Sequence, residues 1–242
     1  YGCLKSNDRY LRFVMLSGVT KFSQVSIFSG LNNLRDISML EEYSTICGIT
    51  PDEINDQLLE GVDELARKYG KDRAGMMAML KDYYDGYHFA EDLRDVYNPY
   101  SLLTALYNNK LGNYWFQSGN PRFLVTRLKE ENIDLYRLQK SVETGTKLQD
   151  IDLVMVNPLP LLFQSGYLTI KGYDMDFDEY TLGYPNREVK ESFLRSLVPC
   201  YIEDDKGISP FDVKRFVREV EGGDVEAFMK RFQALFAGFP YD

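Results

Sequence analysis

The chain has 242 residues, of which 44% are hydrophobic and 14% aromatic, so there is ample apolar material for a packed core. Its formal net charge of -9 argues against a protein whose whole surface binds nucleic acid or acidic lipid, although a local basic face stays open. The three cysteines, Cys3, Cys47 and Cys200, are far apart and odd in number, which disfavours a disulfide framework or a zinc site. No stretch reaches the roughly 18 apolar residues that a membrane span needs. We therefore expect a cytoplasmic protein in a reducing environment, with no membrane partner.

The first predicted element is a β-strand at residues 11–16, an apolar run that ends in small polar residues. Such a run is typical of an interior strand of a parallel sheet, which delivers polar groups at its carboxyl end. No further strand-then-helix units follow residue 30, and one strand cannot form a sheet alone. We therefore expect this strand to be left over from a sheet whose other strands lie upstream in a longer parent protein.

Most of the chain after residue 35 is predicted to be helical. Thr50, Pro51 and Glu53 combine an N-cap, a proline at the first helical position and a capping box, so they begin a helix that Gly70 can end. Asn-Pro pairs use the same cap-plus-proline signal further along the chain. On these grounds and from apolar periodicity, helices are expected at residues 51–69, 74–84, 99–109, 121–131 and 158–165.

A β-hairpin interrupts the helical pattern. Residues 166–170 and 180–182 are short β-prone runs separated by a polar turn rich in Asp and Gly, which predicts that they pair. Asn186 then caps a helix, and helix, hairpin, helix is the order of a winged-helix unit, which we place at 150–203. The predicted linkers are residues 140–149 and 204–207, and the last helices are expected at 209–222 and 224–236.

Complete catalytic signatures are missing from the sequence. G-x-x-x-x-G-K-[ST] does not occur, so no loop of this chain can wrap nucleotide phosphates with its backbone amides. The single histidine, His88, leaves zinc hydrolysis and most Ser-His or Cys-His mechanisms without a required group. Glu188 and Lys190 match half of a restriction-type nuclease triad and Asp52 the other half, but both halves lie at predicted helix starts instead of on adjacent strands. We therefore expect no catalytic residue and no metal site.

Six short motifs follow one another along the chain: GVTKFSQVSIFSGLNNL (18–34), YDGYHF (84–89), VYNP (96–99), YWFQSGNP (114–121), FQSGYLTI (163–170) and LGYPNREV (182–189). In this order they resemble the motifs of the bacterial AAA-ATPase-like family. Members of that family are similar to archaeal-type P-loop ATPases with a helical and winged-helix lid, and they are commonly fused to a C-terminal PD-(D/E)XK nuclease-like domain. The resemblance extends to about residue 201.

The resemblance implies a longer parent protein and a division of this chain. The family's P-loop and acidic metal-binding segment would precede residue 1, and the nuclease-like domain would begin near or after residue 239. ATP and Mg would bind to the intact parent, and neither is expected to bind tightly to this chain alone. The implied fold class is α+β and predominantly helical, with one leftover sheet strand, a helical lid and a winged-helix-like unit with a β-hairpin. The implied parts are the end of a P-loop ATPase core (1–35), a helical lid (36–149), a winged-helix-like unit (150–203) and a helical connection (204–242).

Residues 11–17 resemble the strand that ends in the sensor of such ATPases, where a polar side chain contacts the γ-phosphate or the attacking water. Thr20 and Lys21 are the candidate nucleotide-sensing residues, although Thr20 can instead cap the next helix while Lys21 is a solvated charge. The implied function is to transmit nucleotide-dependent closure from the upstream P-loop core to the downstream nuclease-like domain. The alternative is a stand-alone protein- or nucleic-acid-interaction module that has lost the ATPase chemistry.

The YDGYHF motif gathers a carboxylate, the single histidine and three aromatic rings. We favour a structural interpretation over a catalytic one, in which Asp85 and Gly86 form a turn, Tyr87 and Phe89 pack, and His88 makes a hydrogen bond.

Basic residues near the hairpin form the one candidate nucleic-acid interface. Lys171, Arg187 and Lys190, with Arg195 beyond them, can give a small basic face whose contacts with DNA phosphates are salt-sensitive. Against this, acidic residues crowd the hairpin turn and would repel a phosphate backbone, and lysines and arginines on a helix usually form a solvated face. Both interpretations stay open. The acidic residues of the turn are Asp174, Asp176, Asp178 and Glu179.

Overall fold

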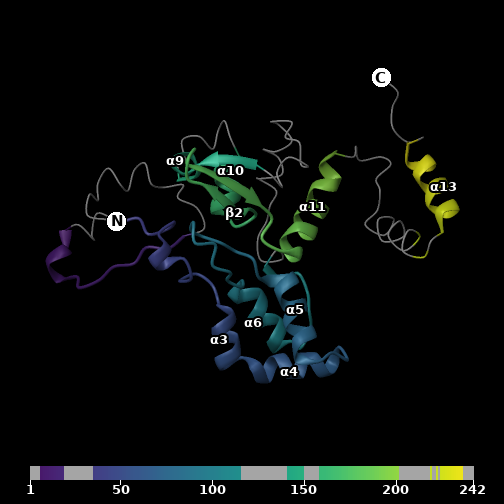
Figure 1. Ribbon diagram of the computed structural model, residues 1–242, viewed down its shortest axis with the longest axis horizontal. Coiled ribbons are helices and arrows are strands. Elements are labelled where there is room, and N and C mark those ends of the chain that lie inside the picture. Colours follow the sequence, from purple (N-terminus) through teal and green to yellow (C-terminus); the bar gives the residue numbers. More distant parts are fainter. Residues whose placement is uncertain are drawn as a thin grey trace. The chain divides into compact units, whose positions relative to one another are not determined.

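The computed structural model describes residues 6–18, 35–115, 141–149, 158–201, 219, 222 and 224–236. The chain divides into two compact units, Tyr1–Ser192 and Phe193–Asp242, and the division falls inside helix α11 (Arg187–Tyr201). In the described part, helices outweigh one small antiparallel sheet, so the predicted α+β, mainly helical fold class is confirmed (Figure 1).

Short helices with clear N-terminal signals build the helical part of the first unit. The predicted capping box is present, since Thr50 Oγ1 accepts a hydrogen bond from the Glu53 amide and Glu53 accepts one from the Thr50 amide. Asn98 caps another helix by accepting from the Ser101 amide at 3.0 Å, as its Asn-Pro signal predicts. Before them lie the 3-10 turns η1 (Asp8–Tyr10) and η2 (Glu41–Tyr43). The helices are α3 (Pro51–Gln57), α4 (Leu59–Lys68), α5 (Arg73–Tyr84) and α6 (Pro99–Tyr107).

The predicted helix at 51–69 is divided at Leu58 into α3 and α4, and both contribute residues to a core shared with α5 and α6. Apolar residues that recur three or four positions apart face one another and are removed from solvent. The buried core residues are Ile54, Val62, Leu65, Ala66, Met76, Leu80, Tyr84, Tyr97, Leu102 and Ala105.

The sheet has three antiparallel strands in the order β1-β3-β2. Strands β2 (Thr169–Asp174) and β3 (Glu179–Gly183) form the predicted hairpin, with a bulge between Ile170 and Gly172. Strand β1 (Ser141–Thr144) pairs with the other edge of β3, and α9 (Gly145–Gln149) follows it directly. The prediction of a linker at 140–149 is therefore wrong, because a four-residue strand is too short to show an alternating pattern. Helix α10 (Leu159–Gln164) precedes the hairpin, as predicted.

Residues 11–18 form neither a helix nor a strand. The strand predicted at 11–16 is thus not formed, and its apolar side chains are exposed, with Phe13 at 81% of its surface. An apolar run becomes a strand only where a neighbouring backbone supplies hydrogen-bond partners. In the described part of the chain, no strand pairs with this segment.

The second unit contains helix α13 (Val225–Phe236), which Asp224 caps by accepting from the Ala227 amide at 3.0 Å, as predicted. The predicted helix at 121–131 and the predicted linker at 204–207 lie outside the described residues, as does the helix predicted at 209–222 except for residues 219 and 222. Within the described ranges, no helix is both long enough and apolar enough to cross a membrane.

Replacing glycine with alanine should have opposite effects on stability at two positions of the first unit. A Cβ added at Gly61 would lie 3.5 Å from Leu106 Cβ, which is an ordinary contact, whereas one added at Gly48 would lie 2.3 Å from Val96 Cβ. We expect Gly61→Ala to raise the free energy of unfolding by about 0.5–1 kcal/mol, because alanine favours a helix interior. Gly48→Ala should lower it by about 1–3 kcal/mol through overpacking. Urea unfolding measures both changes, and effects of the same sign would contradict this packing.

Candidate functional site

The YDGYHF motif lies where the C-terminal end of α5 meets strand β2 and the start of α11. Gly86 adopts a φ of +82°, and a Cβ there would lie 2.5 Å from the Pro185 carbonyl oxygen, so only glycine fits this turn without strain. Around the turn, polar side chains from four segments converge. We call this cluster the polar junction; it comprises Lys81, Asp85, His88, Asp95, Thr169, Lys171 and Asn186.

His88 connects the motif to β2 through both its ring and its backbone. Its Nδ1 lies 2.7 Å from the Ile170 carbonyl oxygen and its Nε2 lies 2.7 Å from Asp95 Oδ1. Both ring nitrogens thus face oxygen acceptors, and only the imidazolium form donates to both at once. The Thr169 hydroxyl accepts from the His88 amide at 2.7 Å and donates to the His88 carbonyl at 2.8 Å. That hydroxyl is engaged by the backbone, so this pair does not have the arrangement of a nucleophile and its general base.

The Lys81 ammonium lies between two carboxylates. Its Nζ donates to Asp95 Oδ2 at 2.9 Å and lies 3.7 Å from Asp85 Oδ2. The hydrogen bond to Asp95 raises the pKa of Lys81. Burial alone would raise the pKa of Asp95, but hydrogen bonds from Lys81 and His88 outweigh it, so the Asp95 pKa is lowered. Asp95 is therefore a stably ionised acceptor that holds α5 and His88 together.

Asp85 is the exception among these charges. Its side chain is 1% exposed, and neither carboxylate oxygen has a hydrogen-bond partner among the described residues. Burial raises the pKa of Asp85, while the Gly86 amide and the Lys81 ammonium offset only part of that effect. A buried carboxylate whose charge is only partly offset costs stability, and such groups are concentrated at functional sites. Asp85 is thus the residue of the junction that packing and hydrogen bonding do not explain.

Lys171 and Asn186 fasten the other side of the turn. Lys171 Nζ donates to the carbonyl oxygens of Gly86 at 2.9 Å and Pro185 at 3.2 Å, and burial lowers its pKa despite the nearby Asp95 and Asp85. Asn186 Nδ2 donates to the Asp85 carbonyl at 3.0 Å, while Asn186 Oδ1 accepts from the Val189 amide at 3.1 Å. Asn186, the predicted cap of α11, therefore also binds the C-terminal end of α5.

A second contact joins α11 to the helical part. Glu188 is buried and its Oε1 accepts from the Trp115 amide at 2.8 Å, and Asn113 Nδ2 donates to Ser192 Oγ at 2.6 Å. Glu188 is one of the residues that match half of a nuclease triad, and it lies in the first turn of α11, as expected. The described residues include no group of three His, Cys, Asp or Glu side chains placed to hold a metal ion.

The predicted site residues have different outcomes. Thr20 and Lys21 lie outside the described residues. Lys171 is part of the polar junction, and Arg187 pairs with Glu191 at 2.6 Å and stacks over the Tyr83 ring at 5.0 Å. Lys190 is exposed on α11. Two of these three cations are thus engaged within the protein, and their binding to DNA stays a prediction.

The sequence predicts the turn, the packing and the hydrogen bond of the YDGYHF motif, but it does not predict three members of the junction, Lys81, Asp95 and Thr169. Tyr87 and Phe89 do stack, with ring centroids 6.3 Å apart. Lys81 and Asp95 were overlooked because a lysine near a helix end and an aspartate in a loop carry no distinctive spacing. The only available signal was a buried motif with one carboxylate and one histidine, which needs counter-charges.

The chain is similar to an uncharacterized protein in the vnfD 5′ region of Azotobacter chroococcum mcd 1, with 35% identity over 248 residues. The match covers 100% of this chain but 45% of that protein, so the chain spans less than half the length of this relative. No family model and no solved structure matches the chain.

Replacing aspartate with asparagine should affect stability differently at the two aspartates of the polar junction. Asp95→Asn should lower the free energy of unfolding at pH 7 by about 1–2 kcal/mol, a value reduced for its partial exposure, because charge-assisted hydrogen bonds are lost. Asp85→Asn should leave it unchanged or raise it by up to about 1 kcal/mol, because a buried charge is removed while Lys81 keeps Asp95. Urea unfolding of both variants measures the difference.

The pH dependence of these two effects also differs in sign. The lowered Asp95 pKa raises the free energy of unfolding. This contribution is complete above the Asp95 pKa of the unfolded chain, about 4, and is lost as the pH falls through the pKa of the folded protein. The raised Asp85 pKa lowers the free energy of unfolding. This loss of stability is complete above the folded pKa of Asp85 and disappears as the pH falls towards the unfolded value of about 4. The benefit of Asp85→Asn should therefore disappear at a higher pH than the cost of Asp95→Asn, and the reverse order would contradict these assignments.

Proposed function

We propose that this chain is the lid part of an AAA-ATPase-like protein and that it transmits nucleotide-dependent closure without catalysing a reaction by itself. In this proposal, ATP and Mg are bound by a P-loop core outside the chain, and the closure reaches a nuclease-like effector domain. The six ordered motifs support the family assignment. The similarity to a protein more than twice the length of the matched region is compatible with a longer parent. We place that parent in the cytoplasm.

The observation that carries the proposal is the polar junction. It links residues of the predicted helical lid, such as Gly86 and His88, to β2 and α11 of the predicted winged-helix-like unit. A lid that transmits a conformational change must move as a rigid body. If the helical lid and the winged-helix-like unit were flexibly connected, movement of one would not displace the other. Hydrogen bonds between segments more than 80 positions apart in the chain contribute to that stiffness.

The order of elements supports the winged-helix part of the proposal. Helix α10, the hairpin of β2 and β3, and helix α11 follow one another as in such a unit. Strand β1 adds a third strand to the hairpin from the side of the predicted lid. The proposed sensor residues, Thr20 and Lys21, would lie upstream of both parts, near the nucleotide of the P-loop core.

The test uses the protein encoded by the complete reading frame that contains this chain. We expect that protein to contain G-x-x-x-x-G-K-[ST], to bind Mg-ATP and to become more resistant to limited proteolysis when ATP is present. The 242-residue chain alone should show no tight ATP binding. Thr20→Ala in the complete protein should slow hydrolysis about tenfold or more while ATP binding is retained.

The junction is tested in the same protein by two lysine substitutions. Lys171→Ala should preserve ATP binding but abolish the ATP-dependent protection, because it removes the bonds to Gly86 and Pro185. Lys190→Ala removes the same charge from an exposed position of α11 and should leave the protection unchanged. A complete protein without a P-loop and without ATP binding would overturn the proposal and favour an interaction module.

A further inference from the structure

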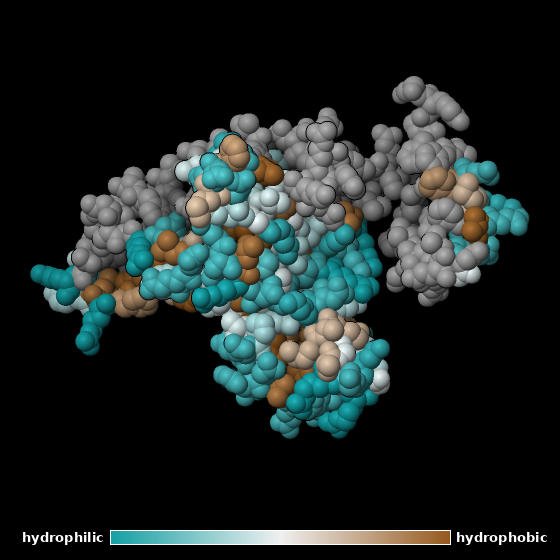
Figure 2. Space-filling model, viewed as in Figure 1, coloured by the Kyte–Doolittle hydropathy of each residue, from teal (hydrophilic) through white to brown (hydrophobic). Residues whose placement is uncertain are grey.

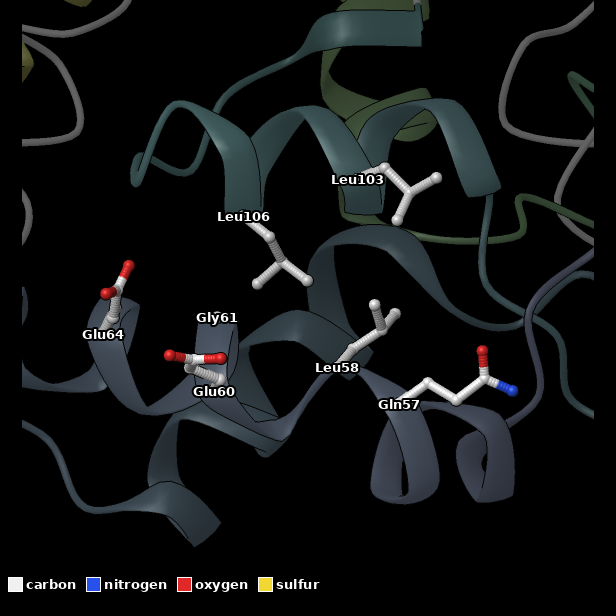
Figure 3. A pocket seen from close by; sticks show the side chains of 7 residues that line it. All are labelled: Gln57, Leu58, Glu60, Gly61, Glu64, Leu103 and Leu106. Carbon is white, nitrogen blue, oxygen red and sulfur yellow. The ribbon is translucent and has the colours of Figure 1, made fainter.

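A hollow of about 420 Å³ lies between helices α4 and α6 of the first unit (Figure 3), and no residue of the polar junction lines it. Its volume falls in the range of about 300–1,000 Å³ that is usual for binding pockets. We call this surface the α4–α6 groove. The residues that line it are Gln57, Leu58, Glu60, Gly61, Glu64, Leu103 and Leu106.

The floor of the groove is apolar. Leu103 and Leu106 extend from α6 towards α3 and α4, and Leu106 lies over Gly61 of α4 (Figure 3). Leu103 is 46% exposed although leucine is usually buried. Figure 2 shows hydrophobic residues bordered by hydrophilic ones on this part of the molecule.

Two tyrosines extend the apolar surface along α6. Tyr100 and Tyr107 lie three and four positions from Leu103, so they share its side of the helix, and they are 55% and 90% exposed. From Tyr100 to Tyr107 the row covers about 10 Å of the helix axis, or two turns. A contiguous row of exposed large side chains marks an interaction surface more often than isolated exposed residues do.

The rim of the groove is acidic. Glu60 and Glu64 lie one turn apart on α4, and neither has an ion-pair partner in the part of the chain that the structure describes. Lys68, one turn further on, donates to the Asn109 carbonyl oxygen instead. The two carboxylates are thus available to cations of a partner, and they repel acidic ligands such as nucleic acid.

We propose that the α4–α6 groove binds an amphipathic helix of a partner protein that carries lysines or arginines beside its apolar face. Two helices already form the walls, and a third helix packs into the groove between two such ridges. Apolar side chains at i, i+3 or i+4 and i+7 of the partner occupy the hollow over Leu103, while its cations lie against Glu60 and Glu64. This inference is independent of nucleotide binding and stands or falls apart from the proposed function.

The experiment titrates the 242-residue chain with a synthetic peptide of four helical turns, with leucines on one face and lysines on both flanks of that face. Isothermal titration calorimetry should give one site with a Kd of about 1–100 μM, weaker at high salt. A peptide of the same composition with its leucines spread around the helix should bind at least tenfold more weakly. Binding of both peptides with equal affinity, or of neither, would overturn the proposal.

Matched variants locate the site. Leu103→Glu, and the double substitution Glu60→Lys with Glu64→Lys, should each weaken binding at least tenfold. The double substitution should also reverse the salt dependence, because salt then screens a repulsion between like charges. Met175→Glu and Asp176→Lys introduce the same kinds of change at the exposed hairpin turn and should not affect binding. All substituted positions are exposed or line the open groove, and circular dichroism checks that each variant is folded. Unchanged binding by the groove variants would contradict the assignment.

Discussion

The hydrogen-bonded row formed by Lys81, Asp95 and His88 is the interaction on which the rest of the described first unit depends. Asp95 is held ionised between a lysine of α5 and the imidazole ring, and the other ring nitrogen reaches the Ile170 carbonyl of β2. Because the ring is fixed at both ends, the turn at Gly86 is held against the hairpin. The position of Asn186, and with it the start of α11, follows from that turn.

Asp85 gives this junction its functional interest. A protein that needed only a firm connection would be more stable with a neutral or apolar residue at a position that is fully desolvated. Asp85 instead lies 3.7 Å from the Lys81 ammonium, which also pairs with Asp95. One cation therefore faces two carboxylates. Lys81 thus contacts both carboxylates at the same time, which adds to the stiffness that the proposed function requires of the junction.

Local signals in the sequence predicted the elements that depend on neighbouring residues. The caps at Thr50, Asn98, Asn186 and Asp224 were predicted, because capping is a contact over three positions. The equally local cap of α5 by Asp72 was not predicted, and Pro158 stands at the N-cap position of α10 without a side-chain hydrogen bond. Contacts between residues far apart in the chain were not predicted. Strand β1 is the clearest case, since it pairs with β3 but is only four residues long, which is too short for a recognisable sequence pattern. The apolar run at 11–16 shows the opposite error, because its composition predicts a strand that the described structure does not form.

If the polar junction holds the helical part and the hairpin together, local unfolding opens both at once, and native-state hydrogen exchange of the chain and of its His88→Ala variant measures this. We expect amides at the end of α5 and amides of β2 and β3 to lose protection by equal amounts in the variant. Loss of protection in the hairpin alone, with α5 unchanged, would contradict it.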